Sequence, residues 1–351
     1  MSTPSTPSAL SAARLPAIPA TSAIPTIPTS IRILLVLLVP ALLVPAFPEI
    51  AYPVFIMKVL CYALFALAFN LLIGFTGLVS FGHAAFFGWA GYTTGILMIR
   101  FSDKGFPVEL AILAGVVIAT GIGWVIGKLA IRRTGIYFSM ITLALSQVAY
   151  FLAVQIPWTG GEDGMQGIPR GKLLGLVDLS ADNHMYYFTL GVFVLAFLLI
   201  HRIVHSPFGQ VLKALRDNAP RAISLGYDTD RCKLYAFMLS AALAGLAGSL
   251  KALVLQLSAL NDVMLSTSTE VLLMTLLGGL ATGWGPVVGA TLVVSLQNHL
   301  AQLGGVVTII IGLTFIVCVS FFRRGLVGEW QALLQRRQFK RKRHHVIALD
   351  A

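Results

Sequence analysis

The sequence predicts an all-α, polytopic membrane protein, and three observations lead to that fold class. Of the 351 residues, 57% are hydrophobic and 11% are charged, and the mean hydropathy is +0.85. An ordinary soluble domain carries about 25% charged residues, so this chain has too little polar surface to face water all round. The apolar residues form blocks of about 20, the length of a helix that crosses a bilayer. The basic residues lie mostly between those blocks.

Ten apolar blocks are candidate transmembrane helices, because a helix satisfies its own backbone hydrogen bonds in hydrocarbon. The first, eighth and ninth blocks are short, so we expect eight to ten spans, some of them broken, tilted or re-entrant. The blocks run over Ile33–Phe47, Tyr52–Ile73, Val79–Ile99, Pro107–Ile131, Gly135–Ile156, Met185–Val204, Leu234–Leu257, Glu270–Ala281, Pro286–Leu300 and Val306–Phe322.

The distribution of Lys and Arg predicts the orientation of these spans. With ten spans and a cytoplasmic N-terminus, 19 of the 25 Lys and Arg residues fall in cytoplasmic segments and four fall on the opposite side. This bias predicts a multi-pass protein of the bacterial inner membrane with both termini in the cytoplasm. It also accounts for the net charge of +11, so nucleic acid is not expected as a partner.

The chain divides into three parts. Residues 1–30 are rich in Ser, Thr, Pro and Ala, which predicts a disordered cytoplasmic tail that is not a cleaved signal peptide. Residues 31–325 form the transmembrane domain, with a long cytoplasmic loop at 205–233. Residues 326–351 form a basic cytoplasmic tail, whose Lys340–His345 run is interpreted as solvated or in contact with anionic membrane lipid.

Motifs for catalysis or nucleotide binding are missing from the sequence. The nearest approach to a P-loop ends at Lys128, but Ile122 stands at the first glycine position and Leu129 replaces the Ser or Thr. Neither H-E-x-x-H nor G-x-S-x-G occurs, and the three cysteines have no metal-site spacing. We therefore expect the chain not to be an enzyme and to hold no metal or cofactor of its own.

The placement of acidic residues bears on how transport across the membrane would be driven. All fourteen acids are expected in loops, in tails or in the outermost turn of a span. Ion-driven transporters usually place an ionisable acid deep in the bilayer, where it carries or coordinates the coupling ion. The pattern therefore counts against proton or sodium coupling, and an ion-coupled secondary transporter or channel is kept as the alternative.

A glycine-rich stretch at 74–95 reads GFTGLVSFGHAAFFGWAGYTTG. One interpretation is close helix packing through small residues, and the other is a broken helix that lines a cavity and offers free backbone amides to an anionic group. His83 lies within the stretch and is interpreted either as hydrogen-bonded packing or as a ligand contact. The candidate pathway residues here are Gly77, Gly82, His83, Gly88 and Tyr92.

Two lysines and a second glycine cluster also lie in the spans. Lys58 and Lys251 fall toward the outer ends of their helices, where snorkelling to water is the favoured interpretation. A role at the outer mouth of a pathway is the alternative, and Lys251 joins the candidate pathway residues for that reason. The cluster GGLATGWGPVVG at 278–289 is interpreted as a tight cytoplasmic turn with close packing, or else as part of a translocation wall.

The cytoplasmic loop at 205–233 carries two predicted short helices. Val211, Leu212 and Leu215 form one apolar stripe in the first helix. Asn218 is the predicted cap of the second, which Gly226 ends. Such amphipathic helices need a partner surface, and their mixed charges favour docking to a soluble protein over lying on an anionic bilayer.

Taken together, these segments resemble the permease subunits of bacterial branched-chain amino acid ABC importers, specifically the M-type partner of the H/M pair. The resemblance covers most of the chain from Val54 to Gly325. It is carried by LLIGFTGLVSFGHAAFFGWAGY from Leu71, KALRDNAPRAISLGYDTDRCKLYAFMLSAALAGLAGSL from Lys213, and LLGGLATGWGPVVGA from Leu276.

This resemblance implies ABC importer permease architecture and a set of partners. They are a second homologous permease, two cytoplasmic ATP-binding subunits that hold ATP and Mg, and a periplasmic solute-binding protein. The loop from Lys213 to Gly226 would be the coupling segment that the ATPase grips. The general importer pattern of Glu-Ala-Ala followed three residues later by Gly is altered here, since Pro220, Arg221 and Ala222 precede Gly226. The candidate coupling residues are Lys213, Arg216, Asp217, Arg221 and Gly226.

The mechanism that the resemblance implies is alternating access. Closure of the ATPases would move the loop that carries Arg216 and Asp217, and the spans would rock around a glycine-lined pathway. The expected solute is a branched-chain amino acid, and urea, short amides and aromatic acids are the alternatives that related permeases serve. A membrane scaffold without transport is the third class of function considered.

Overall fold

The computed structural model describes residues 38, 41–42, 44–46, 52–101, 105–173, 175, 177–301, 306–321 and 325–329. The predictions for the N-terminal tail, most of the first span and most of the C-terminal tail lie outside these residues. Helices dominate the described part of the chain, as the predicted all-α class requires.

The α-helices are α2 (Pro53–Thr76), α3 (His83–Phe101), α4 (Val108–Ala130), α5 (Ile136–Gln155), α6 (Asp182–His205), α7 (Pro207–Asp217), α8 (Ala219–Ser224), α9 (Thr229–Leu255), α10 (Leu265–Gly278), α11 (Gly285–Leu300) and α12 (Val306–Phe321). Three 3-10 turns accompany them, namely η1 (Val44–Ala46), η3 (Pro157–Thr159) and η4 (Leu260–Val263). Two short antiparallel pairs complete the described structure, β1 (Met165–Gln166) with β4 (Leu257–Ser258) and β2 (Lys172–Leu173) with β3 (Val177–Asp178).

Five helices, α2, α4, α5, α6 and α9, are long and apolar enough to cross a membrane. Each predicted block after the first contains one helix, because an apolar run of this length has no other way to satisfy its backbone. Helices α10, α11 and α12 have 14, 16 and 16 residues. They are about 21 to 24 Å long, less than the ~30 Å hydrocarbon core. The chain is thus polytopic, and the count of ten spans stays a prediction.

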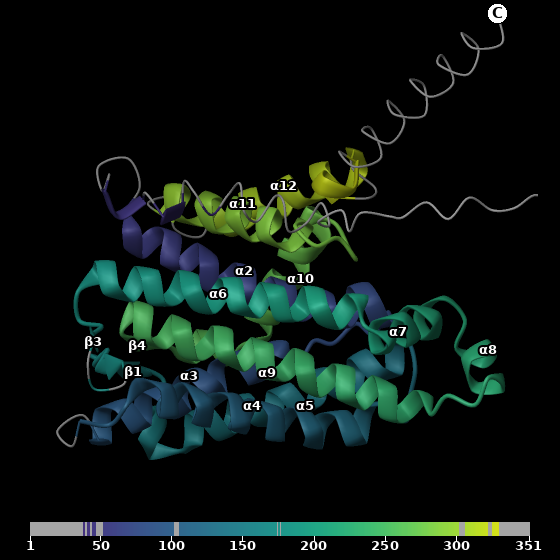
Figure 1. Ribbon diagram of the computed structural model, residues 1–351, viewed down its shortest axis with the longest axis horizontal. Coiled ribbons are helices and arrows are strands. Elements are labelled where there is room, and N and C mark those ends of the chain that lie inside the picture. The colour runs from purple at the N-terminus through teal and green to yellow at the C-terminus, as the bar shows by residue number, and fades with distance from the viewer. Residues whose placement is uncertain are drawn as a thin grey trace, which may run out of the picture.

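The long helices run side by side along the long axis of the molecule (Figure 1). Helix α9 lies at the centre and packs against α2, α3 and α4, and α2 and α9 are the most buried of the five long helices. The short helices α10 and α11 pack against the other side of α2. The strands gather at one end of the bundle, and α7 and α8 project from the other (Figure 1).

The strand-bearing end is fastened to the bundle through Arg170. Its side chain is 7% exposed, and its guanidinium donates to Asp182 Oδ1 at 2.6 Å and to the carbonyl of Val254 at 3.1 Å. A buried guanidinium needs such partners, because charged hydrogen bonds offset its lost hydration. The loop between α5 and α6 is therefore tied to the C-terminal end of α9.

Helix termini at the opposite end follow local sequence signals. The side chain of Asn218 accepts a hydrogen bond from the N–H of Arg221 at 3.1 Å and caps α8. Gly226 has a φ of 86°, its N–H donates to Ile223, and the N–H of Tyr227 donates to Ala222. This pair of bonds is a Schellman ending, which favours glycine at the left-handed position. The predicted cap and end of the second short helix are confirmed.

Candidate functional site

The glycine-rich stretch contains an interruption between two helices. Helix α2 ends at Thr76 and α3 begins at His83, with no helix over residues 77–82. Gly77 has a φ of 74° and its N–H donates to Ile73, which closes α2. The N–H groups of Phe81 and Gly82 donate to the hydroxyls of Thr142 and Ser80, both at 3.2 Å. The non-helical backbone therefore obtains partners from nearby side chains rather than from water.

His83 is fully enclosed at the start of α3. The edges of its ring meet Phe69, Phe86 and Phe237, with ring centroids 4.8, 5.4 and 6.0 Å apart. Its Nε2 atom lies 2.9 Å from Ser240 Oγ, which in turn donates to the carbonyl of Ala68. This chain of contacts joins α3 to α9 and α2, so His83 takes the hydrogen-bonded packing role that was one of its two interpretations.

Further along α3, Gly88 and Tyr92 lie inside the fold rather than on a described cavity. Gly88 sits directly against Val263 of η4, where a side chain would meet the valine methyl group. Tyr92 is 1% exposed. Gly88 thus forms part of the contact between α3 and the segment that links α9 to α10, and Tyr92 is buried within the bundle.

Lys251 is buried near the C-terminal end of α9 and does not snorkel to water. Its Nζ atom lies 2.6 Å from Asp262 Oδ2, and the two side chains are only 6% and 8% exposed. The same carboxylate oxygen accepts the N–H of Ala259 at 3.0 Å. The snorkelling interpretation is therefore wrong for Lys251, because a buried acid 11 residues further along the chain provides a closer partner than solvent.

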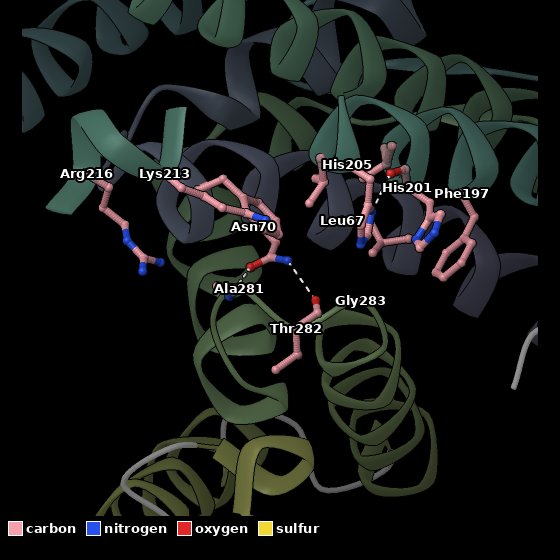
Figure 2. A pocket seen from close by; sticks show the side chains of 13 residues that line it. Leu67, Asn70, Phe197, His201, His205, Lys213, Arg216, Ala281, Thr282 and Gly283 are labelled. Carbon is pink, nitrogen blue, oxygen red and sulfur yellow. Dashed lines mark hydrogen bonds between the residues drawn. The ribbon is translucent and has the colours of Figure 1, made fainter. Parts of the chain in front are cut away.

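A pocket of about 400 Å³ opens where α2, α6, α7 and the α10–α11 turn meet. Figure 2 shows Asn70, Lys213, Arg216 and the residues of the turn around it. We call it the inner pocket. Its lining residues are Leu67, Asn70, Phe75, Phe197, Ile200, His201, Val204, His205, Lys213, Arg216, Ala281, Thr282 and Gly283.

Asn70 fastens the second glycine cluster to α2 at this pocket. Its Nδ2 donates to the carbonyl of Thr282, and its Oδ1 accepts the N–H of Ala281, both at 3.0 Å (Figure 2). Gly278 and Gly285 on either side of the turn meet backbone to backbone. The cluster is thus a tight turn with close packing, which is the favoured of its two interpretations, and it also forms one wall of the inner pocket.

Arg216 and Lys213 join α7 to the end of α2. The guanidinium of Arg216 donates to the carbonyl of Gly74, one of the last α2 carbonyls, and its stem lies against Gly77. The ammonium of Lys213 lies 5.8 Å from the ring centre of Phe75. Both cations meet the negative end of the α2 dipole, which favours them there. The two side chains therefore connect α7 with the last turn of α2, next to the interruption.

The apolar stripe of α7 finds its partner within this chain. Leu212 and Leu215 are buried with Ala222 of α8 and Ala236 of α9. The partner surface that the stripe needs is therefore provided by α8 and α9 of this chain, and docking of the loop's charged residues to a soluble protein stays a prediction. The stripe positions the loop instead of recognising a partner.

The free surface of the loop lies beyond α7. Ile223, Leu225 and Tyr227 are 58%, 70% and 46% exposed, and we call these three residues the tip surface. Arg221 is exposed beside them, and the side chain of Asp217 is 69% exposed. Large apolar side chains at the projecting end of a polar loop are typical of a protein interaction site.

A second pocket, of about 520 Å³, lies between η4, α10, α11 and α12, and we call it the outer pocket. Its central group is Glu270, whose carboxylate accepts a hydrogen bond from the side chain of Gln297. Helix α10 begins at Leu265, five residues before the predicted start, so Glu270 occupies its second turn. The expectation that no acid lies deeper than the outermost turn of a span is wrong for Glu270.

Sequence reasoning missed Asn70, Asp262 and Glu270. The role of Asn70 has no local signal in the sequence, because its hydrogen-bond partners lie 211 and 212 residues further along the chain. The sequence does contain a signal for Asp262. It follows Lys251 by 11 residues, and a reversal of the chain after the helix can bring the two side chains together. Glu270 was assigned to a helix end because several Ser and Thr residues precede it, although hydroxyls can bond back to the helix backbone.

Comparison with known proteins gives one family model, described as a branched-chain amino acid transport system / permease component, which matches residues 54–319. The high-affinity branched-chain amino acid transport system permease protein LivM of Salmonella typhimurium is 26% identical over 289 residues, which are 76% of this chain and 67% of that protein. LivM of Escherichia coli is 27% identical over the same shares.

Other similar proteins carry a different name. The autoinducer 2 import system permease protein LsrC of Salmonella paratyphi B is 27% identical over 228 residues, covering 61% of this chain and 62% of that protein. No solved structure matches the chain.

Proposed function

Because the chain belongs to the family of branched-chain amino acid transport permease components, we propose that it is the membrane subunit of an ABC importer for those amino acids. In this proposal it pairs with a second permease, two cytoplasmic ATP-binding subunits drive it, and a periplasmic binding protein delivers the solute. The interruption between α2 and α3 supports the proposal most directly, because Arg216 links it to a projecting cytoplasmic loop.

The coupling step in this proposal runs through three connected parts. The ATPase binds the tip surface, which is apolar and exposed. The rigid pair α7–α8 carries the movement inward, since the buried contact of Leu212 and Leu215 with Ala236 keeps it attached to α9. Arg216 then pulls on the C-terminal end of α2, where the chain is not helical and bends most easily.

The inner pocket lies where such a movement would act. It is bounded by α7 on one side and by the α10–α11 turn on the other, and Asn70 holds that turn against α2. A shift of α7 relative to α2 would widen or narrow this pocket. We therefore assign it to the inward end of the solute route, with the strand-bearing end of the bundle facing the periplasm.

The coupling assignment is tested with the paired change Ile223→Ser and Leu225→Ser. In proteoliposomes that hold the complete importer, we expect solute-stimulated ATP hydrolysis to fall about tenfold or more, because buried apolar anchors carry most of the energy of an interface. The matched control is Val177→Ser, which changes an exposed apolar residue at the opposite end. Full stimulation in the paired variant would overturn the role of the tip surface.

Glu270 favours one rival function, an ion-coupled secondary transporter. An acid within a membrane helix is the type of group that such transporters use. An uptake assay in proteoliposomes distinguishes the two functions. Uptake by an ABC importer needs ATP hydrolysis by the assembled complex, whereas uptake by a secondary transporter follows a proton or sodium gradient and needs no ATP. We expect dependence on ATP, and gradient-driven uptake by the chain alone would establish the rival.

A further inference from the structure

The outer pocket combines polar side chains with a larger apolar surface. Helix α10 has 14 residues and is about 21 Å long. Its C-terminal end runs into the α10–α11 turn. The short segment η4 lies at its N-terminal end, and Asp262 anchors η4 to Lys251. The outer pocket lies beside η4 at this end of the bundle.

The lining of the outer pocket has a polar side and an aliphatic side. The polar side combines one carboxylate, side-chain amides and hydroxyls, and the aliphatic side comes from α10 and α12. The lining residues are Asn261, Ser266, Thr267, Thr269, Glu270, Leu273, Gln297, Val307, Ile311 and Gly312. Of these ten, Glu270 alone carries a formal charge. The volume of the outer pocket, about 520 Å³, is within the usual range for small-molecule sites.

These groups select for one kind of ligand. A carboxylate surrounded by amide and hydroxyl oxygens accepts the three hydrogens of a protonated amine. A metal ion would need more ligands, and the described residues contain no group of three or more His, Cys, Asp or Glu side chains that could hold one. Leu273, Val307 and Ile311 would contact a branched apolar side chain of the ligand. Burying that side chain against them, away from water, is favourable.

We propose that the outer pocket binds the amino acid during transport, with its ammonium group on Glu270 and its aliphatic side chain against α10 and α12. The proposal rests on the proposed function, since it locates the solute of that transporter. Gln297 is a positioning residue here, because its side chain holds the carboxylate of Glu270 in place.

The first experiment removes the charge and keeps the shape. Glu270→Gln is tested in proteoliposomes with the complete importer and L-leucine on the binding protein. We expect uptake to fall about tenfold or more, the effect of losing a hydrogen bond to a charged group. The control Glu162→Gln makes the same change at an exposed position between α5 and α6.

The second experiment detects ligand in the pocket directly. A cysteine placed by Thr269→Cys, with the native cysteines replaced, is labelled with a maleimide in the assembled importer. L-leucine should slow labelling, whereas 4-methylpentanoate, which has the same carbon branch but no amine, should not. In the Glu270→Gln background L-leucine should no longer protect, and Glu270→Asp should restore part of the protection.

The outcomes separate the two proposals. If the wild-type importer shows no ATP-dependent uptake of solute, the proposed function is wrong, and the proposed solute site is wrong as well. If the importer works and Glu270→Gln takes up L-leucine at the wild-type rate, only the site is wrong. Equal protection by L-leucine and 4-methylpentanoate would also overturn the site, as would an importer that carries only solutes without an amine.

Discussion

At the scale of single residues, two carboxylates lie near the η4 end of α10, and Asp262 is buried whereas Glu270 is half-buried. Asp262 neutralises Lys251 and accepts the N–H of Ala259, so it fixes η4 against α9. Glu270 bonds Gln297 and faces the outer pocket. One acid thus forms a buried ion pair, and the other lines a pocket. Asp262 lies between two helices, as the sequence pattern indicated. Glu270 lies one turn deeper in its helix than predicted, because α10 begins at Leu265, where no side chain caps it.

We predict that Lys251→Met and Asp262→Asn each lower the free energy of unfolding by about 3 kcal/mol, because each leaves a buried charge without its partner. The double variant should lose less than the sum, since both charges are then gone. Denaturant unfolding in detergent followed by ellipticity measures all three. The same changes at Lys172 and Asp178, paired positions on exposed strands, should cost less than about 1 kcal/mol. Strict additivity at Lys251 and Asp262 would contradict a direct pair.

At the scale of elements, the coupling loop shows which parts of a fold local sequence can predict. The cap at Asn218 and the end at Gly226 were predictable, because both depend on bonds within a few residues. The partner of the α7 stripe was not, since Ala236 lies on a different helix and periodicity says only that a face is apolar. The same limit applies to Asn70, whose hydrogen bonds join α2 to a turn more than 200 residues away.

We predict that Gly226→Ala disturbs coupling while Gly191→Ala does not. A φ of 86° costs an alanine about 1 kcal/mol, so the Schellman ending that aims the tip surface is weakened. Gly191 lies within α6 with open space around its Cα, and alanine is the better helix former there. The measurement is the ratio of solute taken up to ATP hydrolysed. Gly226→Pro should lower it further, because proline cannot adopt the angle and removes the N–H that bonds Ile223.

At the scale of the whole molecule, the long helices share one axis (Figure 1). Helices α2, α4, α5, α6 and α9 are aligned between a strand-bearing end and the end that carries α7 and α8 (Figure 1). The apolar blocks predicted this bundle well, because backbone satisfaction in hydrocarbon permits little else. The blocks did not predict which helices lie at the centre. The burial of α9 depends on its small residues meeting those of α3 and α4, a matching between helices that no single block contains.

The bias of Lys and Arg leads to a prediction for the molecule in its membrane. Ser180 is exposed near the strands and Ser224 is exposed in α8, so the two serines mark opposite ends of the bundle. With the native cysteines replaced and the chain expressed without other subunits, Ser180→Cys should react with an impermeant maleimide in intact cells whose outer membrane is permeabilised. Ser224→Cys should react only after the inner membrane is opened, because the positive-inside rule places α7 and α8 in the cytoplasm. The reverse pattern would place the tip surface outside, where no ATPase could reach it, and the coupling proposal would fail together with the orientation.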